Sequence, residues 1–223
     1  MANPRREVPK EPAEPRLSAD LRPADDDLDG LDGAFQLFVQ GRDFSGADLV
    51  EAEIEQCRLS KVSLAGARGS GTTLVDCEIE QSDLANAVFE GGGLRRVRVT
   101  DSRLTGLTFL DGMVRDVLFR ESKVDMVNFR ASTLLNVVFV GCDLTGADFY
   151  GTDLRGAVFT DCVLTGAQFS AAKMAGTRLA GCELSGIGGV SSLAGATIRA
   201  DDLLALTELF AAELGIKIEA PGK

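Results

Sequence analysis

Five cysteines are the most chemically reactive side chains in this sequence. Thiolates bind zinc and exchange disulfides, so clustered cysteines would indicate a metal or redox site. The chain, however, has no His and no Cys-x-x-Cys pair, and the cysteines recur with a regular spacing: three of the four intervals between them are equal. This spacing predicts small inward-facing residues of a reduced protein. We therefore expect no metal and no cofactor at Cys57, Cys77, Cys142, Cys162 and Cys182.

The composition disfavours several other functions. The net charge of −11 argues against direct contact with nucleic acid. Without His the commonest general base is missing, and Gly91-Gly92-Gly93 fits no phosphate-binding loop. No apolar stretch is long enough to cross a membrane, and the polar N-terminus does not resemble a secretory signal. We expect a cytoplasmic protein that is not an enzyme.

An apolar residue at every fifth position is the dominant pattern. It runs over positions 44–184 and fails only at Gly69. The residue two positions earlier is usually small, as in Ala47-Asp48-Leu49. A period of five fits neither a helix nor an ordinary strand, so each five residues form one unit that stacks on others. Two of the five side chains then point inward and three point outward.

Longer periods indicate how many units make one turn. We call the apolar residue of each unit its centre. Over positions 84–184, the centres whose residue numbers end in 9 are Phe in eight of ten cases, whereas those whose numbers end in 4 are Leu, Val or Met. Alternation at every second unit requires an even number of faces. The recurring cysteine interval, as from Cys142 to Cys162, spans four units and makes that number four. The 29 units centred on positions 44–184 then make about seven turns, so the sequence predicts an all-β square solenoid, about 35 Å long at about 4.8 Å per turn.

The tandem motif Ala-[Asp/Asn]-[Leu/Phe]-x-x over residues 42–189 resembles the pentapeptide-repeat proteins. The resemblance implies a right-handed quadrilateral parallel β-helix. Residues 193–198, 201–203 and 214–218 are similar to the end of the MfpA- and Qnr-type members. In that subgroup a closing helix caps the solenoid and forms a homodimer, and the protein binds DNA gyrase as a mimic of duplex DNA and protects it from quinolones. The repeat has no interrupting loop, so loop-borne protection of the Qnr kind is not expected.

Acidic residues concentrate near the N-terminal end of the repeat. Residues 42–90 hold 10 acids and 4 bases, whereas residues 91–130 hold 8 bases and 5 acids. The acids either imitate a phosphate backbone or form ion pairs between turns, as Glu78 and Arg98 could if they lie one turn apart. The candidate partner surface is Glu51, Glu53, Glu55, Asp76, Glu78, Glu80, Asp83 and Glu90. The basic belt that follows includes Arg95, Arg96, Arg98, Arg103 and Arg115.

An apolar outward strip is less expected on such a solenoid. Leu118, Val138 and Val158 recur once per predicted turn, with Val140 near them. Contiguous exposed apolar surface marks a contact with a partner or a second copy, or a groove covered by the N-terminal tail. The simpler alternative is a run of β-forming residues that stabilises the stacking.

The two ends differ from the repeat. Residues 1–33 are Pro-rich and acidic, which predicts a disordered tail before a solenoid over 34–189. Residues 190–223 predict a connector, a helix over about 201–214 capped by Asp201 or Asp202 and ended at Gly215, and a short strand at 216–218. The helix is apolar around much of its circumference, which favours a homodimer contact. The contact residues are Leu203, Leu204, Leu206, Leu209, Phe210 and Leu214.

These patterns lead to two hypotheses. The first is a non-enzymatic, dimeric DNA mimic that binds DNA gyrase or a related type II topoisomerase through its acidic surface. It would modulate that enzyme or protect it from a topoisomerase-poison antibiotic. The alternative is a scaffold that contacts an unidentified protein partner. Neither hypothesis includes direct binding of nucleic acid or membrane.

Overall fold

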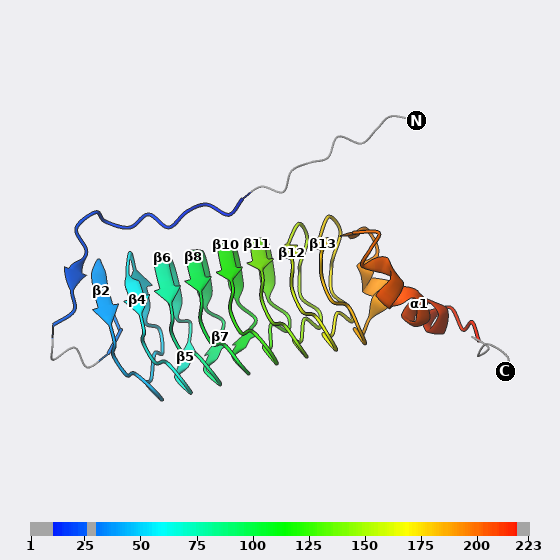
Figure 1. Ribbon diagram of the computed structural model, residues 1–223. Helices are drawn as coiled ribbons and strands as arrows, with labels where there is room; N and C mark the ends of the chain where they lie inside the picture. The colour runs from blue at the N-terminus through cyan, green and yellow to red at the C-terminus, as the bar shows by residue number, and fades with distance from the viewer. Residues whose placement is uncertain (1–10, 26–29, 218–223) are drawn as a thin grey trace.

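Stacked four-sided turns form most of the molecule, as the computed structural model shows (Figure 1). The structure describes residues 11–25 and 30–217. All strand pairs in those residues are parallel, and within the repeat each paired residue lies beside its equivalent four repeat units later, as Phe119 does beside Phe139. The turns number about eight instead of the predicted seven, because the chain on either side of the repeat also pairs with it.

Two sheets hold the turns together. The larger has the order β1-β2-β4-β6-β8-β10-β11-β12-β13-β14 with β3 beside β6, and the smaller has the order β5-β7-β9. Isolated bridges such as Asp43 to Ser63 continue the stacking on the remaining faces. The strands are β1 (Arg22–Pro23), β2 (Leu37–Gln40), β3 (Glu53–Glu55), β4 (Arg58–Ser60), β5 (Arg68–Ser70), β6 (Thr73–Glu80), β7 (Val88–Glu90), β8 (Gly93–Thr100), β9 (Thr108–Leu110), β10 (Met113–Arg120), β11 (Thr133–Val140), β12 (Val158–Thr160), β13 (Arg178–Ala180) and β14 (Thr197–Ile198).

A left-handed residue at every fifth position turns the chain from one face to the next. Many of these corners are Gly, but others carry side chains, such as Met126 with φ of 53° and Ala131 with φ of 56°. A residue with a Cβ atom adopts this conformation at a cost of about 1–2 kcal/mol. The stacked hydrogen bonds on both sides of each corner must therefore offset local strain.

Two columns of phenylalanine rings fill the C-terminal half of the core. Phe119, Phe139 and Phe159 stack with ring centroids 4.8 and 4.9 Å apart. A second column, at positions 129, 149 and 169, has spacings of 5.8 and 5.3 Å. The Phe residues that alternate with aliphatic centres in the sequence thus stack in the core of the solenoid. A small apolar cavity of about 40 Å³ remains where aliphatic centres such as Leu49 and Leu74 give way to the first phenylalanines, such as Phe89 and Phe109.

The N-terminal segment differs from the disordered tail expected for residues 1–33. Residues 11–25, dark blue in Figure 1, run along the solenoid axis and end at β1. There the backbone N–H groups of Arg22 and Ala24 donate to the carbonyls of Gln36 and Phe38 at 3.0 and 2.9 Å. We call residues 11–25 the strap. Leu31 is fully buried, so the core begins before residue 34; the rest of the predicted tail, 1–10 and 26–29, lies outside the described residues.

The C-terminal end is less regular than the single helix expected over 201–214. Two 3₁₀ helices, η1 (Val190–Leu193) and η2 (Leu203–Leu206), precede the short α1 (Thr207–Glu213). Asp202 does not cap a helix with its side chain. Its carboxylate accepts hydrogen bonds from the N–H groups of Gly181 and Cys182, at 2.7 and 3.3 Å, and so covers the edge of the last turn.

The chain beyond α1 follows the prediction only in part. Gly215 has φ of 70°, as expected for a helix stop. The strand predicted at 216–218 is absent at residues 216 and 217, and Ile218 lies outside the described residues. In the part of the chain that the structure describes, no helix is long and apolar enough to span a membrane.

Candidate functional site

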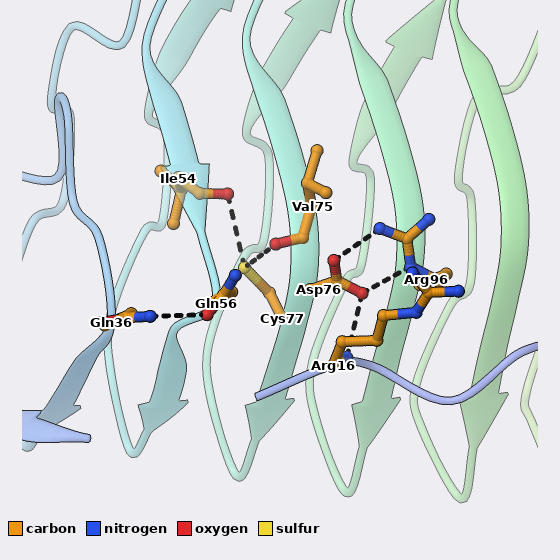
Figure 2. A network of polar contacts seen from close by, with 8 residues as sticks. All are labelled: Arg16, Gln36, Ile54, Gln56, Val75, Asp76, Cys77 and Arg96. Atoms are coloured by element: carbon orange, nitrogen blue, oxygen red, sulfur yellow. Dashed lines mark hydrogen bonds and ion pairs between the residues drawn. The ribbon is translucent and has the colours of Figure 1, made fainter. Parts of the chain in front are cut away.

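One corner of the solenoid carries a ladder of polar side chains, shown in Figure 2. The amide of Gln36 donates to Gln56, one turn later, at 2.9 Å. Further along the same corner, the guanidinium of Arg96 donates to the carboxylate of Asp76 at 2.5 Å, again between neighbouring turns. The strap crosses this corner and brings the backbone N–H of Arg16 to Asp76 at 2.9 Å.

Asp76 is therefore an anchor rather than part of an open acidic surface. The residue is 3% exposed, and its pKa is held below the usual range. The bond from Arg96 is the main cause, and the N–H of Arg16 adds to it, whereas burial acts in the opposite direction. Its negative charge joins two turns and the strap.

Three of the eight predicted surface acids are paired with cations. Besides Asp76, Glu78 lies 2.8 Å from Arg58, and Asp83 lies 3.3 Å from Arg103. Glu78 and Arg98 are adjacent in register, as predicted. They do not pair with each other: Glu78 pairs with Arg58 of the preceding turn, and Arg98 pairs with Glu14 of the strap.

The other predicted acids are spread around the solenoid. Glu53 and Glu55 lie on β3, whereas Glu90 lies on β7 of the smaller sheet, so the eight do not share one face. Glu80 is half-buried. Glu51, Glu53, Glu55 and Glu90 are exposed, and in the described part of the chain no cation lies within 4.0 Å of them.

Sequence reasoning missed a row of acids along another corner. Asp101, Glu121 and Asp161 share one position of the turn, and all three are exposed. Among residues 11–25 and 30–217, none has a cation within 4.0 Å. We call these three the acidic ridge. Their spacing by multiples of 20 residues could have revealed them in the sequence. The charges were instead counted over residues 91–130 as a whole, which placed Asp101 and Glu121 within the basic belt.

Most arginines of the basic belt are paired. Arg96, Arg98 and Arg103 pair with Asp76, Glu14 and Asp83, respectively. Arg115 lies 3.6 Å from its neighbour Asp116. The belt is therefore less cationic toward solvent than its composition indicates.

The five cysteines are buried free thiols. Figure 2 shows the Cys77 thiol directed at the carbonyls of Ile54 and Val75, at 3.4 and 3.3 Å. Burial raises the pKa of Cys77 to about 12, so the thiol stays protonated at neutral pH. Within the described residues, no three Cys, Asp or Glu side chains are grouped so that they could hold a metal ion.

The apolar strip lies on neighbouring strands of the larger sheet. Leu118, Val138 and Val158 are in direct register on β10, β11 and β12. Leu118 and Val158 are buried, whereas Val138 and Val140 are half-buried. Glu11 and Pro12 of the strap line the same groove, so the strip is partly covered by this chain.

The predicted dimer residues divide into two groups. Leu206 is fully buried, and Leu209 and Phe210 pack against the core, so these three cap the solenoid. Leu203, Leu204 and Leu214 are 47%, 80% and 75% exposed and leave an apolar surface at the end of the rod.

Two family models match the repeated part of the chain. One, described as pentapeptide repeats in eight copies, matches residues 52–91, and the other, a pentapeptide repeat region, matches residues 113–188. Together they cover just over half of the sequence. The chain belongs to the pentapeptide-repeat family. No curated protein matches this pentapeptide-repeat protein.

Several solved structures are similar to this pentapeptide-repeat protein. Trypsin-treated QnrB1, a plasmid-mediated fluoroquinolone resistance protein, is 15% identical over 82% of this chain and 99% of its own, with a TM-score of 0.40. A protein from the Arabidopsis thaliana thylakoid lumen is 26% identical over 52% and 67%, with a TM-score of 0.38. HetL from the cyanobacterium Nostoc is 16% identical over 73% and 85%, with a TM-score of 0.29.

Proposed function

We propose that this pentapeptide-repeat protein is a non-enzymatic rod that binds DNA gyrase or a related type II topoisomerase in place of duplex DNA. The observation that carries the proposal is the acidic ridge, whose carboxylates are exposed and have no cation partner in the described residues. Asp101 and Asp161 are three turns apart, or about 14 Å at 4.8 Å per turn. A rigid row of anions on this scale complements the Lys and Arg side chains that contact a phosphate backbone.

The choice of topoisomerase rests on the resemblance of the C-terminal segment to the MfpA- and Qnr-type members. The pairing within the basic belt supports the DNA-mimic part, because Arg96, Arg98 and Arg103 are already engaged by carboxylates. Their positive charge therefore weakens the negative potential of the surface less than the charge of unpaired arginines would.

A homodimer through the C-terminal end is part of the proposal. Leu203, Leu204 and Leu214 expose apolar side chains beside the capped end of the solenoid, where a second copy would bury them. Two rods of about eight turns joined in this way would be roughly 77 Å long at 4.8 Å per turn. Light scattering tests this directly, and a monomer at micromolar concentration contradicts it.

A gyrase supercoiling assay, with and without a quinolone, tests the partner. The wild-type protein should inhibit supercoiling or reduce quinolone-induced cleavage at micromolar concentration. The triple variant Asp101→Lys, Glu121→Lys and Asp161→Lys should lose this effect. The matched variant Glu51→Lys, Glu53→Lys and Glu55→Lys changes as many charges, but these acids lie within a single turn and form no row along the rod, so it should retain most of the effect. No effect of the wild-type protein would reject the topoisomerase, and full activity of the ridge variant would reject the ridge.

A further inference from the structure

The strap runs over the outer face of the solenoid, and the two do not pack fully together. Between them lies a groove with an open volume of about 370 Å³. Strap residues form one wall, and outward side chains of β8, β10, β11 and β12 form the rest. Pro12 and Glu14 line it on the strap side, and Arg98, Leu118, Arg120 and Val138 line it on the solenoid side.

The chemistry of the groove matches the segment that it holds. Leu118 and Val138 give an apolar floor, and Arg98 and Arg120 add positive charge beside it. The strap presents Glu11-Pro12-Ala13-Glu14-Pro15, in which Glu14 pairs with Arg98 and Pro12 lies by the apolar residues. Proline restricts the free peptide to extended conformations, so less conformational entropy is lost when the peptide binds.

The strap is held by few contacts over this part of its length. Within the described residues, one backbone group of the segment 11–21 bonds to the solenoid, the N–H of Arg16 to Asp76. The only ion pair that the segment forms with them joins Glu14 to Arg98. Regular strand pairing starts at Arg22. Local release of residues 11–21 therefore breaks two polar contacts and leaves every turn of the solenoid intact.

We propose that the solenoid face under the strap is a docking site for an acidic, proline-containing extended peptide of a partner protein, and that the strap is its intramolecular occupant. The partner peptide places a carboxylate on Arg98 and apolar side chains over Leu118 and Val138. The strap competes with it at the high effective concentration of a tethered ligand. This proposal does not depend on binding to a topoisomerase.

A labelled peptide with the sequence of residues 11–25 is the probe, and the full-length chain is the receptor. In the variant Glu14→Ala with Arg16→Pro, the strap loses both of its polar contacts with the solenoid surface, since alanine carries no carboxylate and proline has no N–H. Fluorescence anisotropy should show the peptide binding this variant at least about tenfold more tightly than wild type, because the tethered competitor is weakened. Binding should weaken as salt is added.

Matched charge reversals locate the site. Arg98→Glu, added to the opened variant, should abolish binding of the peptide. Arg115 lies on β10, the strand that contributes Leu118 and Arg120 to the groove, but does not itself line it. The control substitution Arg115→Glu should therefore leave peptide binding unchanged. Hydrogen exchange provides a second measurement on the wild-type chain, where saturating peptide should accelerate exchange of the Arg16 amide.

Three results would overturn the proposal. The first is equal affinity of wild type and the opened variant together with an unchanged Arg16 exchange rate. The second is binding that survives Arg98→Glu. The third is strap exchange between copies, detected as dimerisation of the opened variant that the peptide reverses, because it would assign the groove to a second copy of this chain.

Discussion

Asp76 and Arg96, one full turn apart, form an ion pair at 2.5 Å in which the Asp76 side chain is only 4% exposed. The same carboxylate holds the strap through the N–H of Arg16. One ionised group thus contributes both to the stacking of two turns at this corner and to the attachment of the strap.

Replacing Asp76 by Asn should lower the free energy of unfolding by about 2–3 kcal/mol at pH 7, since Arg96 loses its anion in a nearly buried site. The pKa of Asp76 is lowered in the folded state, so the unfolded chain takes up its proton first. The contribution is complete above the unfolded pKa of about 3.9 and is lost as the pH falls through the folded pKa. Urea unfolding from pH 7 to pH 2 should therefore show the two proteins converging in acid, and a constant difference would contradict this reading.

Three consecutive glycines should respond differently to Ala. Gly91 has φ of 62°, so Gly91→Ala should cost about 1 kcal/mol. At Gly92 an added Cβ atom would lie 2.3 Å from the carbonyl oxygen of Thr72, so Gly92→Ala should be the most destabilising of the three. At Gly93 the nearest atom is 3.7 Å away, and Gly93→Ala should be neutral or stabilise by about 0.5 kcal/mol. Thermal melts of the three variants should follow this order; a Gly92 variant as stable as wild type would be inconsistent with it.

The exposed corner residue Ala131 should be improved by Gly. Its φ of 56° strains a residue with a Cβ atom, so Ala131→Gly should stabilise by about 0.5–1 kcal/mol after the entropy of the unfolded chain is subtracted. Ala147 is fully buried and makes the control. Ala147→Gly should destabilise by about 1 kcal/mol in the same denaturant titration.

Truncation within the ring column tests the core. Phe139 stacks between Phe119 and Phe159 at 4.8 and 4.9 Å, so Phe139→Ala should cost about 3–5 kcal/mol. Phe35 is 45% exposed, and Phe35→Ala should cost less than about 1 kcal/mol. Similar losses from the two variants would argue against the stacked column as the main source of stability.

Asp202 should protect the last turn. Asp202→Ala removes the acceptor of the Gly181 and Cys182 amides and should cost about 1–2 kcal/mol. Hydrogen exchange should then accelerate at those two amides before it does in the central turns. Asp201, whose side chain is 83% exposed, is the neighbouring control, and Asp201→Ala should leave the exchange unchanged.

The solenoid was predictable because one local geometry repeats along the chain. The spacing of five placed Phe119, Phe139 and Phe159 in one column, and the structure has them stacked. Pairing between outward charges was not predictable in the same way. Glu78 has Arg58 on one side and Arg98 on the other, each one turn away, and periodicity cannot choose between them. The choice depends on Glu14, which belongs to no repeat.

The strap shows a second limit of sequence patterns. Residues 11–25 have too few apolar side chains to form a core of their own, which predicts disorder. Their order comes from a surface formed by distant residues, including Asp76, Arg98 and Leu118. The acidic ridge was missed for a related reason, since neighbours on the ridge are separated by whole turns of sequence.

Because successive turns pair in register, the number of residues between two positions decides whether they lie on the same side of the rod. Deleting one whole turn from the repeat, that is four units, would shorten the rod and keep every later residue on its original side. Deleting a single unit would rotate everything that follows by a quarter turn. Such a deletion between Glu121 and Asp161 would divide the acidic ridge between two corners while every remaining repeat unit stayed intact. Whole turns therefore set the reach of this rod, and partial turns set which surfaces face a partner together.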